Sequence, residues 1–211
     1  MRTRIKICGL TRSDDVAAAA VVGADAVGFV CYLKSPRFVG PERLLELARA
    51  VPPLVTPVLL FVNAAPAEVR AALELVPHAL LQFHGDEPEV WCAQFQRPWL
   101  RAVRMAEGVD LLDCERRFPS AAGLLADAPS AGFGGSGESF DWSRLPLRRS
   151  RPLILAGGLN ADNVGAAITQ VRPWAVDVSS GVESAPGIKD ARRIHEFIAA
   201  VRAADDTQSS S

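Results

Sequence analysis

The sequence lacks the features that mark membrane proteins, secreted proteins and nucleic-acid-binding proteins. None of its 211 residues belongs to a run that approaches the ~20 apolar residues of a membrane span. The opening residues, Met1–Asp15, also lack the apolar stretch of a signal peptide. Lysine and arginine together number 23 and aspartate and glutamate 24, so no overall positive field attracts nucleic acid or an anionic membrane. Any anionic ligand must therefore be bound by local groups.

Cysteine is also scarce, and its spacing argues against two common kinds of site. The four residues Cys8, Cys31, Cys92 and Cys114 are scattered. They have neither the short paired spacing of a zinc site nor the density of a secreted disulfide framework. We therefore predict reduced thiols, no bound metal and a cytoplasmic protein. Three of the four are expected to fill space in the core, whereas Cys8 has a position of its own.

Short apolar runs rich in Val, Ile and Leu alternate along the chain with longer segments in which apolar residues recur every three or four positions. Such alternation is typical of strands and helices that take turns. The runs are continuously apolar, which indicates parallel strands covered on both faces, with helices as the crossovers. Eight runs are predicted as strands: Arg4–Cys8, Asp25–Val30, Val55–Val62, Ala79–Phe83, Trp99–Arg104, Gly123–Asp127, Pro152–Ala156 and Ala175–Val178.

The pattern predicts an α/β protein with one domain, a single (β/α)8 TIM barrel over residues 1–203. Eight such units in this length suit a closed barrel, although an open doubly wound sheet has the same periodicity. The last helix is clearly amphipathic, because apolar residues from Ile194 to Val201 recur at i, i+3, i+4 and i+7. Residues 204–211 offer nothing to bury and are predicted to form a disordered tail.

Two reactive side chains end predicted strands, and in both architectures the chemistry gathers at the carboxyl ends of the strands. Cys8 ends the first strand, where a thiolate could act as a general base or as a nucleophile; the alternative is a buried cysteine that packs as a small apolar residue. Asp127 ends the sixth, where a carboxyl group could act as a general acid; the alternative is a capping or turn residue. One group would then take a proton from carbon while the other gives a proton to oxygen, as moving a double bond within a sugar requires.

Glycines follow the seventh and eighth strands, where barrels commonly bind phosphate. Gly157 and Gly158 allow backbone N–H groups to approach a ligand closely, and Ser180 and Gly181 occupy the equivalent place one strand further on. Loops at these two places bind phosphate through glycine amides and a helix N-terminus in many barrels. We therefore predict a phosphate site at these four residues.

Two further polar residues follow strands. Arg37, which comes after a stiffening proline, suits a planar carboxylate that it can hold through two hydrogen bonds, although a solvated surface arginine has the same pattern. His84 is expected to orient its loop or support the site rather than to perform chemistry.

The glycine-rich segment Gly132–Ser139 nearly spells the phosphate loop of nucleotide hydrolases. Glu138 stands where that motif has its lysine, and a carboxylate there would repel phosphate. We therefore reject a nucleotide site and predict a mobile lid or rim loop.

Taken together and in this order, the strand ends resemble those of the phosphoribosylanthranilate isomerase family. The resemblance covers nearly the whole chain, and eight ordered matches of this kind are highly specific. The matching segments are KICGLTR at Lys6–Arg12, GADAVGFV with SPRFV within Gly23–Val39, LLFVN at Leu59–Asn63, QFHGDE at Gln82–Glu87, LLAD at Leu124–Asp127, GGSGESFDW at Gly134–Trp142, LAGGLNADNV at Leu155–Val164 and VDVSSGVESAPGIKD at Val176–Asp190.

The resemblance implies an enzyme of tryptophan biosynthesis that isomerises N-(5-phosphoribosyl)anthranilate by an Amadori rearrangement without a cofactor. It assigns Cys8 as the general base that removes the C2 proton and Asp127 as the general acid that protonates the ring oxygen. It also assigns Arg37 to the anthranilate carboxylate. The phosphate-binding loops match at Gly157, Gly158, Ser180 and Gly181. To act as an acid at neutral pH Asp127 needs a raised pKa, whereas Cys8 needs a lowered one.

Two alternatives remain open at this point. A dual-substrate isomerase would also accept the related ribonucleotide of the histidine pathway, but such relatives use two carboxylates, whereas the first strand here ends in a thiol. A non-catalytic phosphosugar-binding barrel would need only the phosphate loops. In each case we expect a small phosphosugar ligand, no nucleic-acid or membrane partner, and a monomer or a homodimer.

Overall fold

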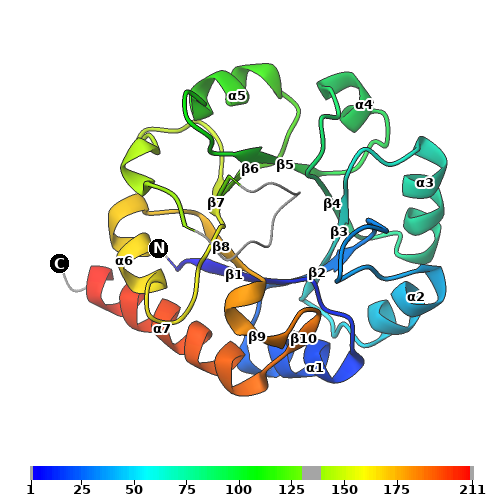
Figure 1. The fold of residues 1–211 in the computed structure, drawn as a ribbon, viewed down its shortest axis with the longest axis horizontal. Helices are drawn as coiled ribbons and strands as arrows, with labels where there is room; N and C mark the ends of the chain where they lie inside the picture. Colours follow the sequence, from blue (N-terminus) through cyan, green and yellow to red (C-terminus); the bar gives the residue numbers. More distant parts are fainter. Residues whose placement is uncertain (1, 130–138, 210–211) are drawn as a thin grey trace.

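The computed structural model describes residues 2–129 and 139–209, and these form a closed barrel of eight parallel strands (Figure 1). Each strand pairs with the next along the chain, and β8 pairs with β1 to close the ring. The predicted (β/α)8 barrel is therefore confirmed, and an open doubly wound sheet is excluded. The strands are β1 (Arg4–Cys8), β2 (Ala26–Val30), β3 (Thr56–Phe61), β4 (Leu80–Phe83), β5 (Trp99–Arg104), β6 (Gly123–Asp127), β7 (Leu153–Leu155) and β8 (Ala175–Val178).

Helices follow the strands and surround the barrel, as Figure 1 shows. They are α1 (Ser13–Val22), α2 (Pro41–Arg49), α3 (Pro66–Leu75), α4 (Glu89–Ala93), α5 (Leu111–Arg117), α6 (Val164–Val171) and α7 (Ala191–Ser209). In the described part of the β6–β7 crossover, the only helical turn is the 3-10 turn η1 (Trp142–Arg144). The predicted lid, Gly132–Ser139, lies outside the described residues except for its last one. No helix in the described ranges is long and apolar enough to cross a membrane.

The C-terminal helix runs further than the sequence pattern predicts. The stripe from Ile194 to Val201 is fully buried, as expected, where α7 packs against α1 and α6. The predicted disordered tail is wrong for residues 204–209, because α7 continues to Ser209. Asp205 accepts hydrogen bonds from the backbone N–H of Thr3 at 2.7 Å and from its hydroxyl group at 2.6 Å. This last segment is held by polar contacts, which hydrophobic periodicity does not reveal.

Side chains along each strand point alternately outward and inward, so they form two separate packed layers. Outward side chains such as Phe29, Phe61 and Phe83 are fully buried in the large core that the strands share with the helices. Inward side chains form a smaller cluster within the barrel: Leu100, Ala102, Leu125, Ile154, Ala156 and Ala175. Because all strands are parallel, their carboxyl ends meet at one mouth, where the loops can gather reactive groups.

One element at the mouth is not predicted by the sequence patterns. After β8 the chain forms the 3-10 turn η2 (Ser180–Val182) and a hairpin of β9 (Glu183–Ala185) and β10 (Ile188–Lys189). Gly187 turns this hairpin with a φ of 79°, a value that favours glycine. The hairpin brings two charged side chains, Glu183 and Lys189, into buried positions beside the mouth.

Candidate active site

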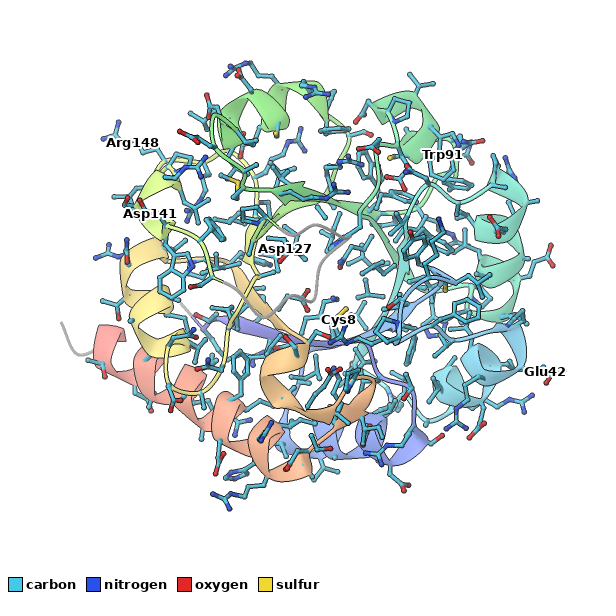
Figure 2. All side chains as sticks on the ribbon, in the orientation of Figure 1. Cys8, Glu42, Trp91, Asp127, Asp141 and Arg148 are labelled. Atoms are coloured by element: carbon cyan, nitrogen blue, oxygen red, sulfur yellow. The ribbon has the colours of Figure 1, made fainter. Side chains whose placement is uncertain are left out.

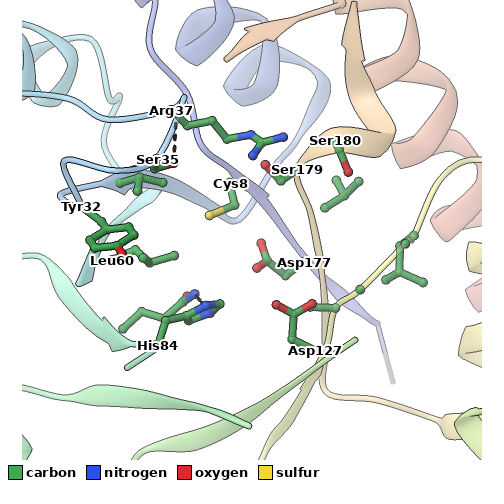
Figure 3. Close-up of a pocket in the computed structure, with 17 residues that line it drawn as sticks. Cys8, Tyr32, Ser35, Arg37, Leu60, His84, Asp127, Asp177, Ser179 and Ser180 are labelled. Atoms are coloured by element: carbon green, nitrogen blue, oxygen red, sulfur yellow. Dashed lines mark hydrogen bonds between the residues drawn. The ribbon is translucent and has the colours of Figure 1, made fainter. Parts of the chain in front are cut away.

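A pocket with about 720 Å³ of space open to solvent lies at the carboxyl end of the barrel (Figure 3). Seven of the eight predicted site residues line the pocket: Cys8, Arg37, His84, Asp127, Gly157, Gly158 and Ser180. Gly181 is not among the lining residues. The fold therefore brings residues that are distant in the sequence around one pocket. Apolar side chains such as Leu60 complete its lining.

Cys8 and Asp127 both project into the centre of the barrel mouth, from β1 and β6 respectively (Figure 2). Figure 3 shows the thiol and the carboxyl group on two sides of the same pocket. Both residues are nearly inaccessible, with 5% and 8% of their surface exposed. A small ligand in this pocket can therefore contact a thiol and a carboxyl group at once, away from bulk water.

Burial raises the pKa of Asp127 from 3.8 to about 6. The low polarity of the site disfavours the charged form, and the nearby Asp177 carboxylate acts in the same direction. The hydrogen bond of 2.9 Å that the backbone N–H of Ala128 donates to Asp127 Oδ1, together with the charges of Lys6 and Arg104, opposes the rise only in part. The predicted direction of this pKa change is therefore confirmed.

The raised pKa has a consequence for stability, which Asp127→Asn should reveal. Below about pH 3 the carboxyl group is mostly protonated in both folded and unfolded chains. As pH rises toward 6, the unfolded chain releases its proton first, so the folded state loses up to about 3 kcal/mol relative to low pH. Asparagine cannot ionise. We expect the variant to unfold at higher urea concentration than the wild type at pH 8, with a much smaller difference near pH 4.

The matched control for this measurement is Asp113→Asn, which removes one carboxylate from the exposed face of α5. Its effect should be small at both pH values, because exposed ion pairs contribute little. An equal stability difference between the Asp127 variant and the wild type at pH 4 and pH 8 would contradict the burial argument.

The prediction of a lowered Cys8 pKa is wrong for this structure. Burial raises the pKa of the Cys8 thiol, because a thiolate loses most of its hydration in this position. The charges of Lys6 and Lys189 lower the pKa, and that of Asp177 raises it further, but burial is the largest effect. The sequence shows neither the depth of the thiol nor the carboxylate beside it.

Arg37 is held in place by a residue that the sequence does not identify as part of the site. Its Nε and Nη2 donate to the two carboxylate oxygens of Glu183 at 2.8 and 2.7 Å. Gly9 makes room for this side chain, since a Cβ there would lie 2.5 Å from Arg37 Cδ, and its φ of 74° also favours glycine. Nη1 and the second N–H of Nη2 form another fork that can bind a planar carboxylate.

The glycine loops after β7 and β8 pack against each other at the pocket wall. Gly157 and Gly158 have φ values of 81° and 63°, and a Cβ on Gly157 would lie 2.4 Å from the backbone nitrogen of Ala128. A Cβ on Gly181 would lie 2.0 Å from the carbonyl oxygen of Leu159, in the other loop. Gly181 thus allows the two loops to meet, while Gly157, Gly158 and Ser180 line the pocket.

His84 lies beside Gln82 at the pocket floor. The His84 Nε2 and Gln82 Nε2 atoms are 2.9 Å apart, in hydrogen-bond contact. Gln82 is fully buried and lines the pocket, and within the described residues its Oε1 has no hydrogen-bond partner. Gln82 Oε1 is therefore a buried acceptor beside the pocket, and the sequence analysis does not identify it.

Four charged residues at the site are missing from the sequence prediction. Lys6 and Asp177 form a buried ion pair of 2.9 Å, and Lys189 donates to Glu183 at 2.8 Å. The sequence does carry a signal for the first pair. Lys6 interrupts the apolar run of β1, RIKIC, and Asp177 interrupts that of β8, AVDV. Within the ranges that the structure describes, no group of three or more His, Cys, Asp or Glu side chains could hold a metal ion.

Comparison with known proteins gives an independent set of findings. The family model for "N-(5'phosphoribosyl)anthranilate (PRA) isomerase" matches residues 5–200. The chain is 56% identical over 207 residues to the N-(5'-phosphoribosyl)anthranilate isomerase of Dechloromonas aromatica, an alignment that covers 98% of this chain and 100% of that protein.

Solved structures agree with the sequence matches. The phosphoribosyl anthranilate isomerase of Thermotoga maritima superposes with a TM-score of 0.86 at 41% identity, covering 95% of this chain and 99% of that one. A second phosphoribosyl anthranilate isomerase, solved in complex with reduced 1-(o-carboxyphenylamino)-1-deoxyribulose 5-phosphate, superposes with a TM-score of 0.83 at 38% identity and the same coverage of 95% and 99%.

Proposed function

The chain belongs to the N-(5'-phosphoribosyl)anthranilate isomerase family, and we propose that Cys8 and Asp127 are the general base and general acid of its reaction. The enzyme converts N-(5'-phosphoribosyl)anthranilate into 1-(2-carboxyphenylamino)-1-deoxyribulose 5-phosphate, a step of tryptophan biosynthesis. The observation that carries the proposed roles is that the thiol and the carboxyl group face one pocket.

The proposed chemistry begins at the ring oxygen of the aminoaldose. Asp127 donates its proton to this oxygen as the bond from C1 to the ring oxygen breaks, and the lone pair of the anthranilate nitrogen forms a C1=N double bond. The thiolate of Cys8 then removes the proton from C2. The electrons of that C–H bond form C1=C2, and the nitrogen recovers its pair, which yields an enolamine that tautomerises to the ketone. Burial supports the first step, since it keeps a larger share of Asp127 protonated near neutral pH.

Arg37 is proposed to bind the anthranilate carboxylate through the fork that Glu183 leaves available. The Glu183 carboxylate fixes the guanidinium from one side, so the arginine loses little freedom when a ligand binds. A second carboxylate on the same guanidinium is electrostatically acceptable because Lys189 offsets the charge of Glu183. His84 and Gln82 are proposed to support the substrate between the two ends.

The phosphate is proposed to bind where the loops after β7 and β8 meet. Gly157, Gly158 and Ser180 line that side of the pocket. The β7–α6 loop is rigid: Asn160 Oδ1 accepts from the N–H groups of residues 162 and 163, and Asn163 Nδ2 donates to the carbonyl of Gly158 at 2.9 Å. Such preformed backbone amides suit a phosphate.

Gly181→Ala tests the loop contact on which this phosphate site depends. The added methyl group would meet the Leu159 carbonyl at 2.0 Å, so the two loops must separate. We expect the inhibition constant of inorganic phosphate to rise about tenfold, which corresponds to ~1.4 kcal/mol of the strain that overpacking introduces.

The control for this variant is Gly165→Ala on α6, where the nearest atom to the new Cβ would be 4.0 Å away. Alanine also favours the helix at this position by up to about 1 kcal/mol. Phosphate inhibition should be unchanged in Gly165→Ala, and equal inhibition constants in both variants would argue against the proposed site.

A turnover assay of the purified protein with N-(5'-phosphoribosyl)anthranilate tests the proposed function as a whole. A parallel assay with the related ribonucleotide of the histidine pathway distinguishes a dual-substrate isomerase, and we expect no turnover of that compound because Cys8 replaces the carboxylate such relatives use. A protein that binds phosphate but turns over neither compound would be a binding barrel.

The proposed chemistry draws every group from one chain, so it proceeds alike in a monomer and in a homodimer. No nucleic-acid or membrane partner enters it. All four cysteines are free thiols, which supports the proposed location in the reducing cytoplasm.

A further inference from the structure

Lys6 is a charged side chain in the interior of the barrel, between two fully buried isoleucines of β1. Only 4% of its surface is exposed, and its ammonium group lies 2.9 Å from Asp177 Oδ1. The two residues are register partners on the neighbouring strands β1 and β8. A buried ammonium group is costly unless it is paired. The Asp177 carboxylate therefore fixes the position of this cation.

The Cys8 thiol shares the space around this cation. Cys8 follows Lys6 by two positions on β1, so both side chains point to the barrel interior. The register partner of Cys8 on β2 is Gly28, and a Cβ there would lie 2.7 Å from Cys8 Sγ and 3.1 Å from Lys6 Nζ. Because glycine leaves this volume empty, no side chain separates the ammonium from the sulfur, and its positive charge acts on the thiol.

The charged groups around Cys8 carry a net positive charge of one, which one further negative charge would balance. Lys6 on β1 pairs with Asp177 on β8, while Arg37 and Lys189 share the Glu183 carboxylate. Three cations thus face two carboxylates. The remaining titratable groups that line the pocket are Asp127 on β6, Tyr32 after β2 and His84 after β4, and the charge of Arg104 at the end of β5 acts on Asp127. When Asp127 carries its proton, an ionised Cys8 balances the net positive charge of these three cations and two carboxylates. Lys6 opposes the effect of burial on the thiol more strongly than Lys189 does.

We propose that Lys6 is a positioning residue that, fixed by Asp177, holds the Cys8 sulfur in place and stabilises the thiolate that removes the substrate's C2 proton. The catalytic part of this statement rests on the proposed function of Cys8. The coupling between the ammonium and the thiol does not depend on that function and can be measured without turnover.

Asp177 acts on the thiol in the opposite direction. Its carboxylate orients Lys6, but its own negative charge raises the pKa of Cys8 and that of Asp127. Removing the carboxylate alone should therefore make the thiolate easier to form, whereas removing both members of the pair should make it harder to form. A purely structural role of the ion pair would not give changes of opposite sign.

The test is the rate at which iodoacetamide alkylates Cys8 as a function of pH, resolved by peptide mass spectrometry from Cys31, Cys92 and Cys114. In Lys6→Met/Asp177→Asn we expect the midpoint of the rate profile to move up by about one pH unit, so that alkylation at a given pH below it slows roughly tenfold. In Asp177→Asn the midpoint should move down and alkylation should accelerate several-fold. Lys6→Arg, which keeps the cation, should stay close to the wild type.

The double variant is preferred to Lys6→Met because the single change would leave a buried, unpaired carboxylate and would destabilise the fold. Circular dichroism checks that each variant folds. Asp177→Asn and Lys6→Arg keep the cation and carry the test if the double variant does not fold. An unchanged midpoint in Asp177→Asn, or a shift in the same direction as in the double variant, would overturn the proposal.

Turnover separates this proposal from the proposed function. If Cys8 is the base, the double variant should show a lower kcat with KM nearly unchanged, and its pH profile should shift with the alkylation midpoint. If Cys8→Ser keeps full turnover, the assignment of the base fails, while the alkylation data still report whether Lys6 stabilises the thiolate.

Discussion

Replacing Asp127 with asparagine is expected to lower kcat for N-(5'-phosphoribosyl)anthranilate by about 100-fold or more, the usual contribution of a general acid. Asparagine has nearly the same shape, and its Oδ1 can still accept the hydrogen bond from Ala128. It has no acidic proton to give to the ring oxygen. Because the substrate should still bind, the loss should fall on kcat, with KM changed by no more than about threefold.

The pH dependence of kcat/KM tests the role of Asp127 more specifically than the size of the rate loss does. The reaction needs Asp127 protonated and Cys8 ionised, yet the pKa of Asp127 is about 6 and that of Cys8 is raised above its ordinary value. At pH 7 only about one tenth of the free enzyme carries the Asp127 proton. Between the two pKa values, one fraction falls as fast as the other rises, so their product is constant.

We therefore expect kcat/KM of the wild type to rise up to about pH 6, stay level, and fall above the pKa of Cys8. In Asp127→Asn the residual kcat/KM should keep rising through pH 6 to 8, because only the ionisation of Cys8 remains. The substrate phosphate titrates near pH 6 as well, but it does so equally for both proteins. Exposed Asp113→Asn is the control and should match the wild type. If kcat/KM of the Asp127 variant were constant between pH 6 and 8, or its kcat lay within fivefold of the wild type, Asp127 would not be the general acid.

The second large effect is expected from Cys8→Ser, which should also lower kcat about 100-fold or more. A hydroxyl group fits the space beside Gly28, but its proton is far more tightly held than that of a thiol, so almost no alkoxide forms near neutral pH. Cys8→Ala, which has no base at all, should be at least as slow. Both variants should retain their phosphate inhibition constants, because the phosphate loops lie on other strands.

Cys114→Ala is the matched control for these cysteine variants, since Cys114 is buried on α5 outside the barrel. It should keep the kcat of the wild type even if it lowers the unfolding temperature. Steady-state kinetics at pH 7.5 is the measurement. Turnover by Cys8→Ser above about one tenth of the wild-type rate would mean that another group removes the C2 proton.

The strands could be predicted from sequence because each one is an apolar run enclosed by turns. The bounds of β1, β5, β6 and β8 agree with the prediction, and those of the other four strands differ by one residue at one end or at both. The end of α7 could not be predicted, because Asp205 is held by hydrogen bonds to Thr3 at the other end of the sequence.

Most of the candidate site residues could be predicted from position at strand ends and from the family resemblance, but their electrostatic setting could not. Lys6 and Asp177 are 171 positions apart, and the contact between them follows from the register of β1 with β8. The direction of the Cys8 pKa change depends on how deeply the thiol is buried, which no local pattern reveals. Glu183 could not be predicted as part of the site, because the β9–β10 hairpin that brings it to Arg37 has no clear sequence pattern.

The contact between Thr3 and Asp205 also bears on how the protein can be handled. It lies at the amino end of β1, on the face of the barrel opposite the mouth, and it brings both ends of the described chain together. A purification tag, a surface linker or a fused enzyme attached at either terminus would therefore project from the face of the molecule opposite the mouth. Substrate would still enter freely from the other side, which makes this chain well suited to immobilisation or to fusion with a neighbouring enzyme.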